Sequence, residues 1–137
     1  MDSKLIKAYT ETDYHILPLE LIVKIGVINS RLDYEMEKQS WLNYSIITAW
    51  NPGSVPSAYE DNLIQNLRLL KDLVENDFVI YPALGKSKQN FWKPEESWCV
   101  FNISKSFATE LGSKYNQNAI VYAEINKAPE LLYCREF

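Results

Sequence analysis

The segment from Ser57 to Asn76 constrains the fold most, because it is a long amphipathic helix between two strand-like segments. Its apolar residues recur at the spacing of one helical face: Leu63, Leu67, Leu70 and Val74, with Ile64 and Leu73 beside them. Ser57 and Glu60 have the spacing of a capping box. Burying six such side chains stabilises a fold by roughly 10 kcal/mol before chain entropy is subtracted. The stripe is therefore expected to face a sheet.

Strand patterns surround this helix. Residues 19 to 27 alternate apolar and polar side chains, and residues 9 to 16 precede them as a first strand. The run "WLNYSIITAW", residues 41 to 50, is β-branched and aromatic, which predicts a central strand buried on both faces. Further strands are predicted at residues 78 to 84, where Pro82 indicates an edge, and at 97 to 103 and 118 to 125.

Two shorter helices complete the pattern. One covers residues 29 to 40, where Ser30 and Asp33 have capping-box spacing, and the other follows Ser104. The resulting order is β-β-α-β-α-β-β-α-β, with a last short strand expected at "ELLYC". This order predicts an α+β fold with a single mixed sheet and helices packed on it. At 137 residues the chain is expected to form one domain over 1–137.

Composition excludes several classes of protein. The formal net charge is -4 and the pI is near 5.0, which argues against a broad basic face, so a nucleic-acid partner is not expected. No apolar run reaches the roughly 18 to 20 residues of a membrane span, and the N-terminal residues lack the core of a signal peptide. We therefore expect a soluble, cytoplasmic protein without a membrane partner.

Residues that support metal or nucleophilic chemistry are scarce. The chain has one histidine, His15, and two cysteines, Cys99 and Cys134, which form no CxxC pair. A multi-histidine zinc site is therefore not expected, and a catalytic triad would depend on His15 alone. No GxxxxGK or GxGxxG motif is present, so the sequence indicates neither a metal nor a cofactor.

Polar side chains are concentrated at the ends of the predicted strands. Thr48 and Asn51 end the central strand, Glu95, Glu96 and Ser97 precede another, and Gln117 and Asn118 stand between a helix and a strand; Asn62 lies on the long helix. Loops at strand ends commonly hold ligands on a rigid sheet edge. We therefore predict that these residues converge on one site, with Glu96 as its acid or base.

Each of these residues also has a structural interpretation. Asn51 before Pro52 is a frequent turn starter, the glutamates could be solvated, and Asn116 or Asn118 could cap a helix. The loop with Lys86, Lys88, Lys93, Phe91 and Trp92 is basic and aromatic. Such a segment could stack a base, cover the site as a lid, or dock its rings on the core.

Several strings occur in an order that is similar to that of a known family. They are "TAWNPGS" at 48–54, a helix carrying Asn62, "W-x-P-E-E-S" at 92–97, "LGSKYNQNAIVY" at 111–122 and the early Tyr9-x-x-Thr12-x-Tyr14. The chain resembles a small, mostly bacterial family catalogued as domain of unknown function 3293. The resemblance covers nearly the whole chain and implies a shared fold. It supplies no catalytic residue, because the family has no assigned activity.

Three functions fit these patterns. The first is binding of a small polar or anionic, nucleotide-like ligand by Thr48, Asn51, Glu96, Ser97 and Gln117. The second is a hydrolase or transferase that uses Glu96 as acid or base and Asn51 to orient its substrate. The third is a regulator or inhibitor that binds a protein partner through exposed Trp and Tyr side chains.

Overall fold

The computed structural model describes residues 2–88 and 92–135. Its helices are α1 (Ser3–Thr10), α2 (Ser30–Gln39), α3 (Tyr59–Glu75) and α4 (Lys105–Lys114), and short 3-10 helices lie at Leu17–Leu19 and Pro52–Ser54. Its strands are β1 (Thr12–Ile16), β2 (Leu21–Val23), β3 (Asn43–Ile47), β4 (Val79–Ser87), β5 (Glu95–Phe101), β6 (Ala119–Glu124) and β7 (Glu130–Tyr133).

The strands form one seven-stranded sheet in the order β2-β1-β4-β5-β3-β6-β7. The predicted α+β fold with a single sheet is confirmed, and the predicted element order recurs after an additional N-terminal helix. Every strand pair is antiparallel, so the sheet is not mixed. The reason lies in the connections: α2, α3 and α4 each join strands that are not neighbours, and the neighbouring pairs in chain order are hairpins.

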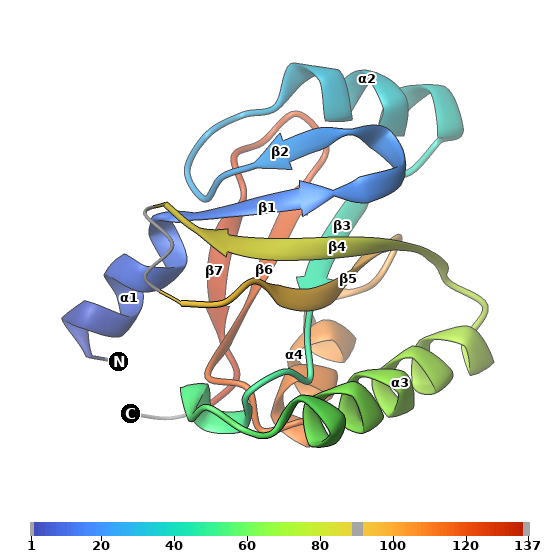
Figure 1. The fold of residues 1–137 in the computed structure, drawn as a ribbon. Helices are drawn as coiled ribbons and strands as arrows, with labels where there is room; N and C mark the ends of the chain where they lie inside the picture. Colours follow the sequence, from blue (N-terminus) through green and yellow to red (C-terminus); the bar gives the residue numbers. More distant parts are fainter. Residues whose placement is uncertain (1, 89–91, 136–137) are drawn as a thin grey trace.

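The curled sheet has an apolar cluster on each face. One cluster joins α2, through Leu32 and Met36, to Cys99 and Phe101 of β5. The other joins α3 and α4 to Val100, because successive strand residues face opposite sides. Figure 1 shows the same arrangement, with α2 above the sheet, α3 and α4 below it, and α1 beside the start of β1.

Two predictions about the strands need correction. Tyr9 and Thr10, expected in the first strand, end α1, whose cap is Asp2 accepting from Lys4 N at 2.7 Å. The second strand is only three residues long because the chain enters it from a 3-10 helix and a left-handed Glu20 with φ 53°. β3 has neighbours on both sides, as predicted.

Pro82 lies in β4, which is an interior strand rather than an edge strand. Its partner on β5 is Trp98, while the pairing with β1 begins one residue later, at Ala83. The half of β4 from Val79 to Pro82 therefore pairs with β5, and a proline there removes no hydrogen bond to β1.

The buried face of α3 differs from the predicted stripe. Its buried residues are Asn62, Asn66, Leu69 and Leu73, whereas Ile64, Leu67 and Val74 are each about half exposed. The hydrophobic pattern misidentified this face because two asparagines turn inward to bond backbone groups at the strand ends, as described below. Counting apolar residues could not anticipate that the helix would present polar side chains to the sheet.

The predicted capping boxes are not formed. Asn29 caps α2 by accepting from Leu32 N at 3.0 Å, while Ser57 N donates to Asn51 Oδ1 at 3.0 Å and Ala58 precedes α3. The predicted cap of α4 is confirmed, since Ser104 Oγ accepts from Phe107 N at 3.1 Å. The start of α3 is thus tied to the turn after β3 rather than to its own first turn.

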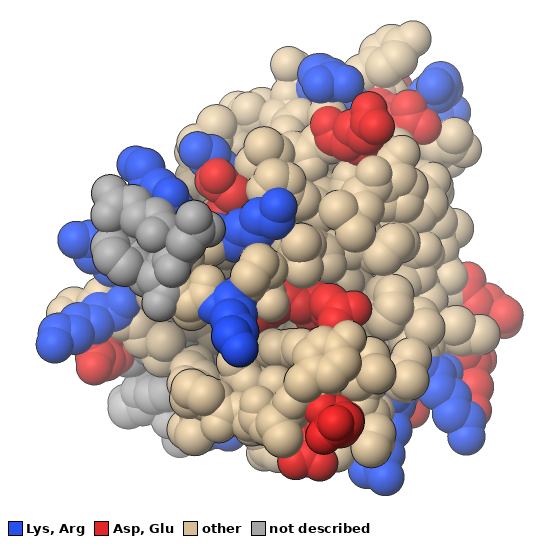
Figure 2. Space-filling view, in the orientation of Figure 1, with Lys and Arg blue, Asp and Glu red and all other residues tan. Residues whose placement is uncertain are grey.

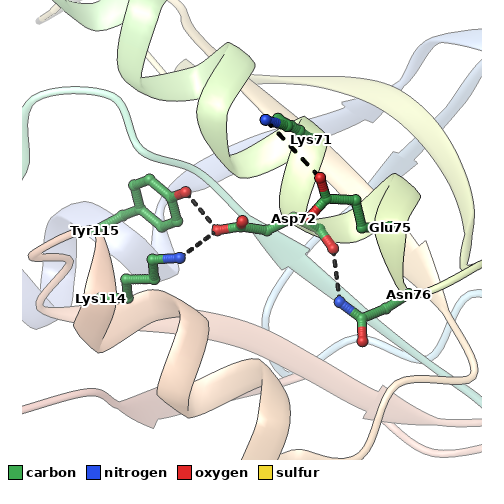
Figure 3. Close-up of polar contacts among 6 residues, drawn as sticks. All are labelled: Lys71, Asp72, Glu75, Asn76, Lys114 and Tyr115. Carbon is green, nitrogen blue, oxygen red and sulfur yellow. Dashed lines mark hydrogen bonds and ion pairs between the residues drawn. The ribbon is translucent and has the colours of Figure 1, made fainter.

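A polar contact joins α3 to the end of α4 (Figure 3). Asp72 Oδ2 accepts from Tyr115 Oη at 2.5 Å and from Lys114 Nζ at 2.8 Å. These two bonds lower the pKa of Asp72, while burial and the same carboxylate raise the pKa of Tyr115. The contact fixes the two helices side by side under one face of the sheet.

None of the helices in the described ranges is both long and apolar enough to cross a lipid bilayer.

Candidate functional site

A pocket of about 260 Å³ opens on the face of the sheet that also carries α2. Its walls come from α1, β1, the end of β3, β4, the start of β5 and β6. The polar side chains around it are Thr12, Thr48, Asn51, Ser54, Glu95, Ser97 and Gln117. Strand-end residues that are distant in the chain therefore surround one cavity, as the sequence predicts for Thr48, Asn51, Glu95, Ser97 and Gln117.

Asn51 organises the turn after β3. Its backbone is left-handed, with φ 45°, a conformation that asparagine tolerates better than most residues. Its side-chain oxygen accepts from Asn62 Nδ2 at 2.8 Å and from Ser57 N at 3.0 Å, and its Nδ2 donates to Glu95 Oε1 at 3.0 Å. Asn51 thus bonds the helix start and β5, rather than forming only a local turn.

Asn62 and Asn66 support this turn from α3. Asn62 Oδ1 accepts from Asn51 N at 2.8 Å, and Asn66 Oδ1 accepts from Ala49 N at 3.0 Å. Both side chains are buried behind the pocket wall, outside its lining. Asn62, a predicted ligand residue, therefore lies one contact away from the cavity and holds Asn51 in place.

Thr48 and Gln117 fix the same turn from two other sides. Thr48 Oγ1 donates to the Glu96 carbonyl at 2.6 Å and accepts from Trp50 N at 3.0 Å. Gln117 Nε2 donates to the Trp50 carbonyl at 3.2 Å. Asn118 is buried outside the lining, where its Nδ2 donates to Ser54 Oγ at 3.0 Å. These bonds make the rim of the pocket a connected polar network.

Glu95 and Glu96 point to opposite faces of β5. Glu95 shares a face with Ser97 and lines the pocket, whereas Glu96 is exposed and shares the other face with Trp98. Glu96 contributes its backbone carbonyl to the network but is not among the lining residues. The sequence analysis assigned the acid or base role to Glu96, whereas the glutamate that lines the cavity is Glu95.

Burial raises the pKa of the Glu95 carboxyl, and the hydrogen bond from Asn51 partly offsets this effect. Two tyrosines lie near it in the pocket, and burial raises the pKa of Tyr9 and of Tyr14, with the Glu95 charge adding to both. The cavity therefore contains a carboxyl group that binds a proton more readily than one in water, beside two neutral phenols.

Sequence reasoning did not assign Tyr9, Thr12, Tyr14, Trp50 or Ser54 to the site, although all five line the pocket. In the sequence, the spacing Tyr9-x-x-Thr12-x-Tyr14 contributes to the family resemblance and carries no site assignment of its own. Thr12 and Tyr14 share one face of β1 by period two, and Tyr9 follows Leu5 by one helical turn. Tyr9 reaches the pocket because residues 3–10 form a helix, and predicting that helix would have placed Tyr9 beside Thr12 and Tyr14.

The basic, aromatic loop contributes in part. Trp92 lines the pocket, while Lys86 lies on β4 beside the lining residue Gly85, opposite Asp13 of β1, and is not itself in the lining. Phe91 lies outside the described residues. The suggestion that this loop stacks a base or covers the site stays a prediction.

Charges of both signs are interspersed over the face seen in Figure 2, with wide uncharged areas between them. Within residues 2–88 and 92–135, no group of three or more His, Cys, Asp or Glu side chains could hold a metal ion. Cys99 is buried, Cys134 is half-buried, and both are free thiols. The chemistry of the pocket thus depends on one carboxyl, several hydroxyls and amides, and aromatic rings.

The fold and pocket define an α+β protein with a small cavity at the ends of its strands. A family model described as "Protein of unknown function (DUF3293)" matches residues 47–120. This span exceeds half of the chain, so the chain belongs to that family. It includes the turn at Asn51, all of α3 and the Glu95 strand. No curated protein and no solved structure matches the chain.

Proposed function

We propose that the pocket binds a small polar molecule through the side chains at the ends of β3 and β5. The observation that carries the proposal is the bond from Asn51 Nδ2 to Glu95 Oε1, 3.0 Å long, in the wall of a cavity of about 260 Å³. Small-molecule sites are concave and mostly apolar, with a few fixed polar groups. Leu5, Ile46 and Val121 supply apolar wall here, and the asparagine network fixes the polar groups.

Size and charge narrow the ligand. Typical ligand pockets span about 300 to 1,000 Å³, so a cavity of about 260 Å³ suits a ring-sized molecule better than a whole nucleotide. Its described lining includes the carboxyl of Glu95 and neither Lys nor Arg. These features favour an uncharged or positively charged ligand over the anionic one that the sequence suggested.

A fragment screen by ligand-observed NMR tests the proposal, with two variants as references. Gly85 lines the pocket, so the side chain added in Gly85→Val narrows it. The substitution should be tolerated, because a Cβ there meets only ordinary contacts, to Thr12 at 3.5 Å and to Tyr14 at 3.7 Å. Lys86→Val, on the same strand but outside the lining, is the matched control. Fragments should bind the native chain and Lys86→Val and lose binding to Gly85→Val.

Thermal unfolding provides the second readout. A ligand at a hundred times its Kd stabilises the folded chain by about 2.7 kcal/mol. The same hits should raise the melting temperature of the native chain and of Lys86→Val but not of Gly85→Val. Hits that bind all three proteins equally, or a screen without hits, would contradict the proposal.

A second candidate function is acid or base catalysis by Glu95, favoured by the raised pKa of this pocket carboxyl. It replaces Glu96 in the role predicted from the sequence, because Glu95 faces the cavity. Hydrolysis assays with ester, phosphoester and glycoside substrates should detect turnover that Glu95→Gln abolishes and Glu96→Gln retains. Equal turnover in both variants would exclude this mechanism.

A further inference from the structure

The hydroxyl of Ser97 is unusual within the pocket. Ser97 is 6% exposed and lines the cavity, and its Oγ has no hydrogen-bond partner in the described part of the chain. Buried polar atoms in native proteins are almost always paired, because an unpaired one loses its bonds to water without replacement. A polar group of a molecule bound against Ser97 would supply the partner that this hydroxyl lacks.

Glu95 stands two residues before Ser97 on the same face of β5. Asn51 Nδ2 donates to its Oε1 at 3.0 Å, which fixes the carboxyl group in the wall. Among the described lining residues, Glu95 is the charged one. An ionised carboxylate only accepts hydrogen bonds, so the group that pairs with it must be a donor.

The remaining walls suit a flat ring. Tyr9, Tyr14, Trp50 and Trp92 line the cavity together with aliphatic side chains such as Ile46. An apolar cavity of about 150 Å³ holds a benzene molecule, so about 260 Å³ admits one ring with a polar substituent. Aromatic faces also attract cations.

We propose that the pocket takes an aromatic ring bearing a cationic N–H donor group, such as an amidinium, whose donors bond to Glu95 and Ser97. A charged N–H to carboxylate bond is stronger than a neutral one, and a planar pair of donors matches the two oxygens of a carboxylate. An anion would meet the Glu95 charge without a compensating base in the described lining. This inference rests on the proposed binding function and specifies its ligand class.

Three probes of nearly equal shape test it: benzamidine, benzamide and benzoate, which differ in charge. Isothermal titration at pH 7 should give the tightest binding for benzamidine, about tenfold weaker binding for benzamide, and the weakest for benzoate. Glu95→Gln keeps an acceptor for Asn51 and should remove most of the preference for benzamidine over benzamide. Ser97→Ala should weaken both ligands, and the exposed neighbour change Glu96→Gln should leave the ranking intact.

Melting temperatures of the variants identify any that fail to fold. Benzoate binding as tightly as benzamidine, or a benzamidine preference that survives in Glu95→Gln, would overturn the inference. So would absence of binding by all three probes while other fragments bind in a manner blocked by Gly85→Val, and in that case the proposed function stands. If no fragment of any kind binds, the inference and the proposed function both fail.

Discussion

The Nδ2 atom of Asn51 lies 3.0 Å from Oε1 of Glu95, so the turn after β3 is bonded to the first residue of β5. The two residues are 44 positions apart in the chain. Asn62 holds the same asparagine from α3 through two bonds of 2.8 Å. One side chain thus connects the long helix, the central strand and the carboxyl group of the pocket.

Replacing Asn51 should destabilise the fold through both its side chain and its backbone. Asn51→Ala removes three side-chain bonds and places an alanine at φ 45°, so we expect a loss of roughly 2 to 4 kcal/mol in the free energy of unfolding. Asn51→Gly removes the same bonds but tolerates the backbone, and it should lose less. Urea unfolding measures both; a cost near zero for either variant would show that the network contributes nothing.

Glu95→Gln should make the protein more stable at neutral pH. Burial raises the folded-state pKa of Glu95, so the stability gained by its protonated form is present below the unfolded pKa and is lost as pH rises through the folded one. The glutamine does not titrate. The difference in free energy of unfolding between Glu95→Gln and the native chain should therefore grow as pH rises from the unfolded pKa of Glu95 through its folded pKa, and then level off.

Urea unfolding at a series of pH values measures this difference between Glu95→Gln and the native chain. Tyr9 and Tyr14 are the titratable groups facing Glu95, and burial keeps the pKa of each above its ordinary value, outside this range. Glu96→Gln, which removes one negative charge from the exposed face, is the control. A stability difference that does not change with pH would contradict the raised pKa.

Asp72→Asn should weaken the contact between α3 and α4. Asp72 accepts from Lys114 and Tyr115, and these bonds lower its folded pKa, so their stabilisation is present above the unfolded pKa and is lost as pH falls through the folded one. We expect the variant to lose about 1 to 2 kcal/mol at pH 7, reduced by solvent screening of the partly exposed pair, and to lose progressively less on acidification.

The exposed pair of Lys71 and Glu75, 3.9 Å apart and also drawn in Figure 3, provides the control for Asp72. Glu75→Gln should change the free energy of unfolding by less than about 0.5 kcal/mol. Calorimetry at pH 7 and in acid compares the two variants. Equal losses for both would show that the Asp72 contact is no stronger than an ordinary surface pair.

Gly112→Ala should destabilise α4 although alanine favours helices. A Cβ at this position would clash with Sγ of Cys134 and come within 2.9 Å of Cγ2 of Ile120. Overpacking of this kind costs roughly 1 to 3 kcal/mol, more than the gain of about 1 kcal/mol in helix propensity. Thermal unfolding should show partial recovery when Cys134→Ala is added, since the contact with Ile120 remains, and little change in Ser113→Ala. A more stable Gly112→Ala would contradict the close packing.

The sequence predicted the strands best where both faces are buried. The run 41 to 50 contains β-branched and aromatic residues, and the strand within it, β3, is largely buried and lies between β5 and β6. Residues 3–10 were missed as a helix because the chain there is short and buries no residue completely. The local sequence pattern predicts a short helix poorly, because tertiary contacts supply most of its stability.

For the candidate site, the sequence predicts the segments that surround the pocket better than the individual side chains that line it. Thr48, Asn51, Ser97 and Gln117 line the pocket, as expected from strand ends. The acid or base role was predicted for Glu96, but side chains alternate along β5, and Glu95 is the glutamate that lines the pocket. The inward face of α3 could not be read from hydrophobicity. Asn66 is buried because Ala49 N and the Glu96 carbonyl need partners, and no local pattern records that need.

The curled sheet ends on its two shortest strands, β2 with three residues and β7 with four, while the nine residues of β4 lie inside. An unprotected edge strand can pair its backbone amide and carbonyl groups with another extended chain, and long edge strands of this kind promote aggregation. Here the two edge strands are only three and four residues long. We therefore expect concentrated samples to resist edge-to-edge association between copies.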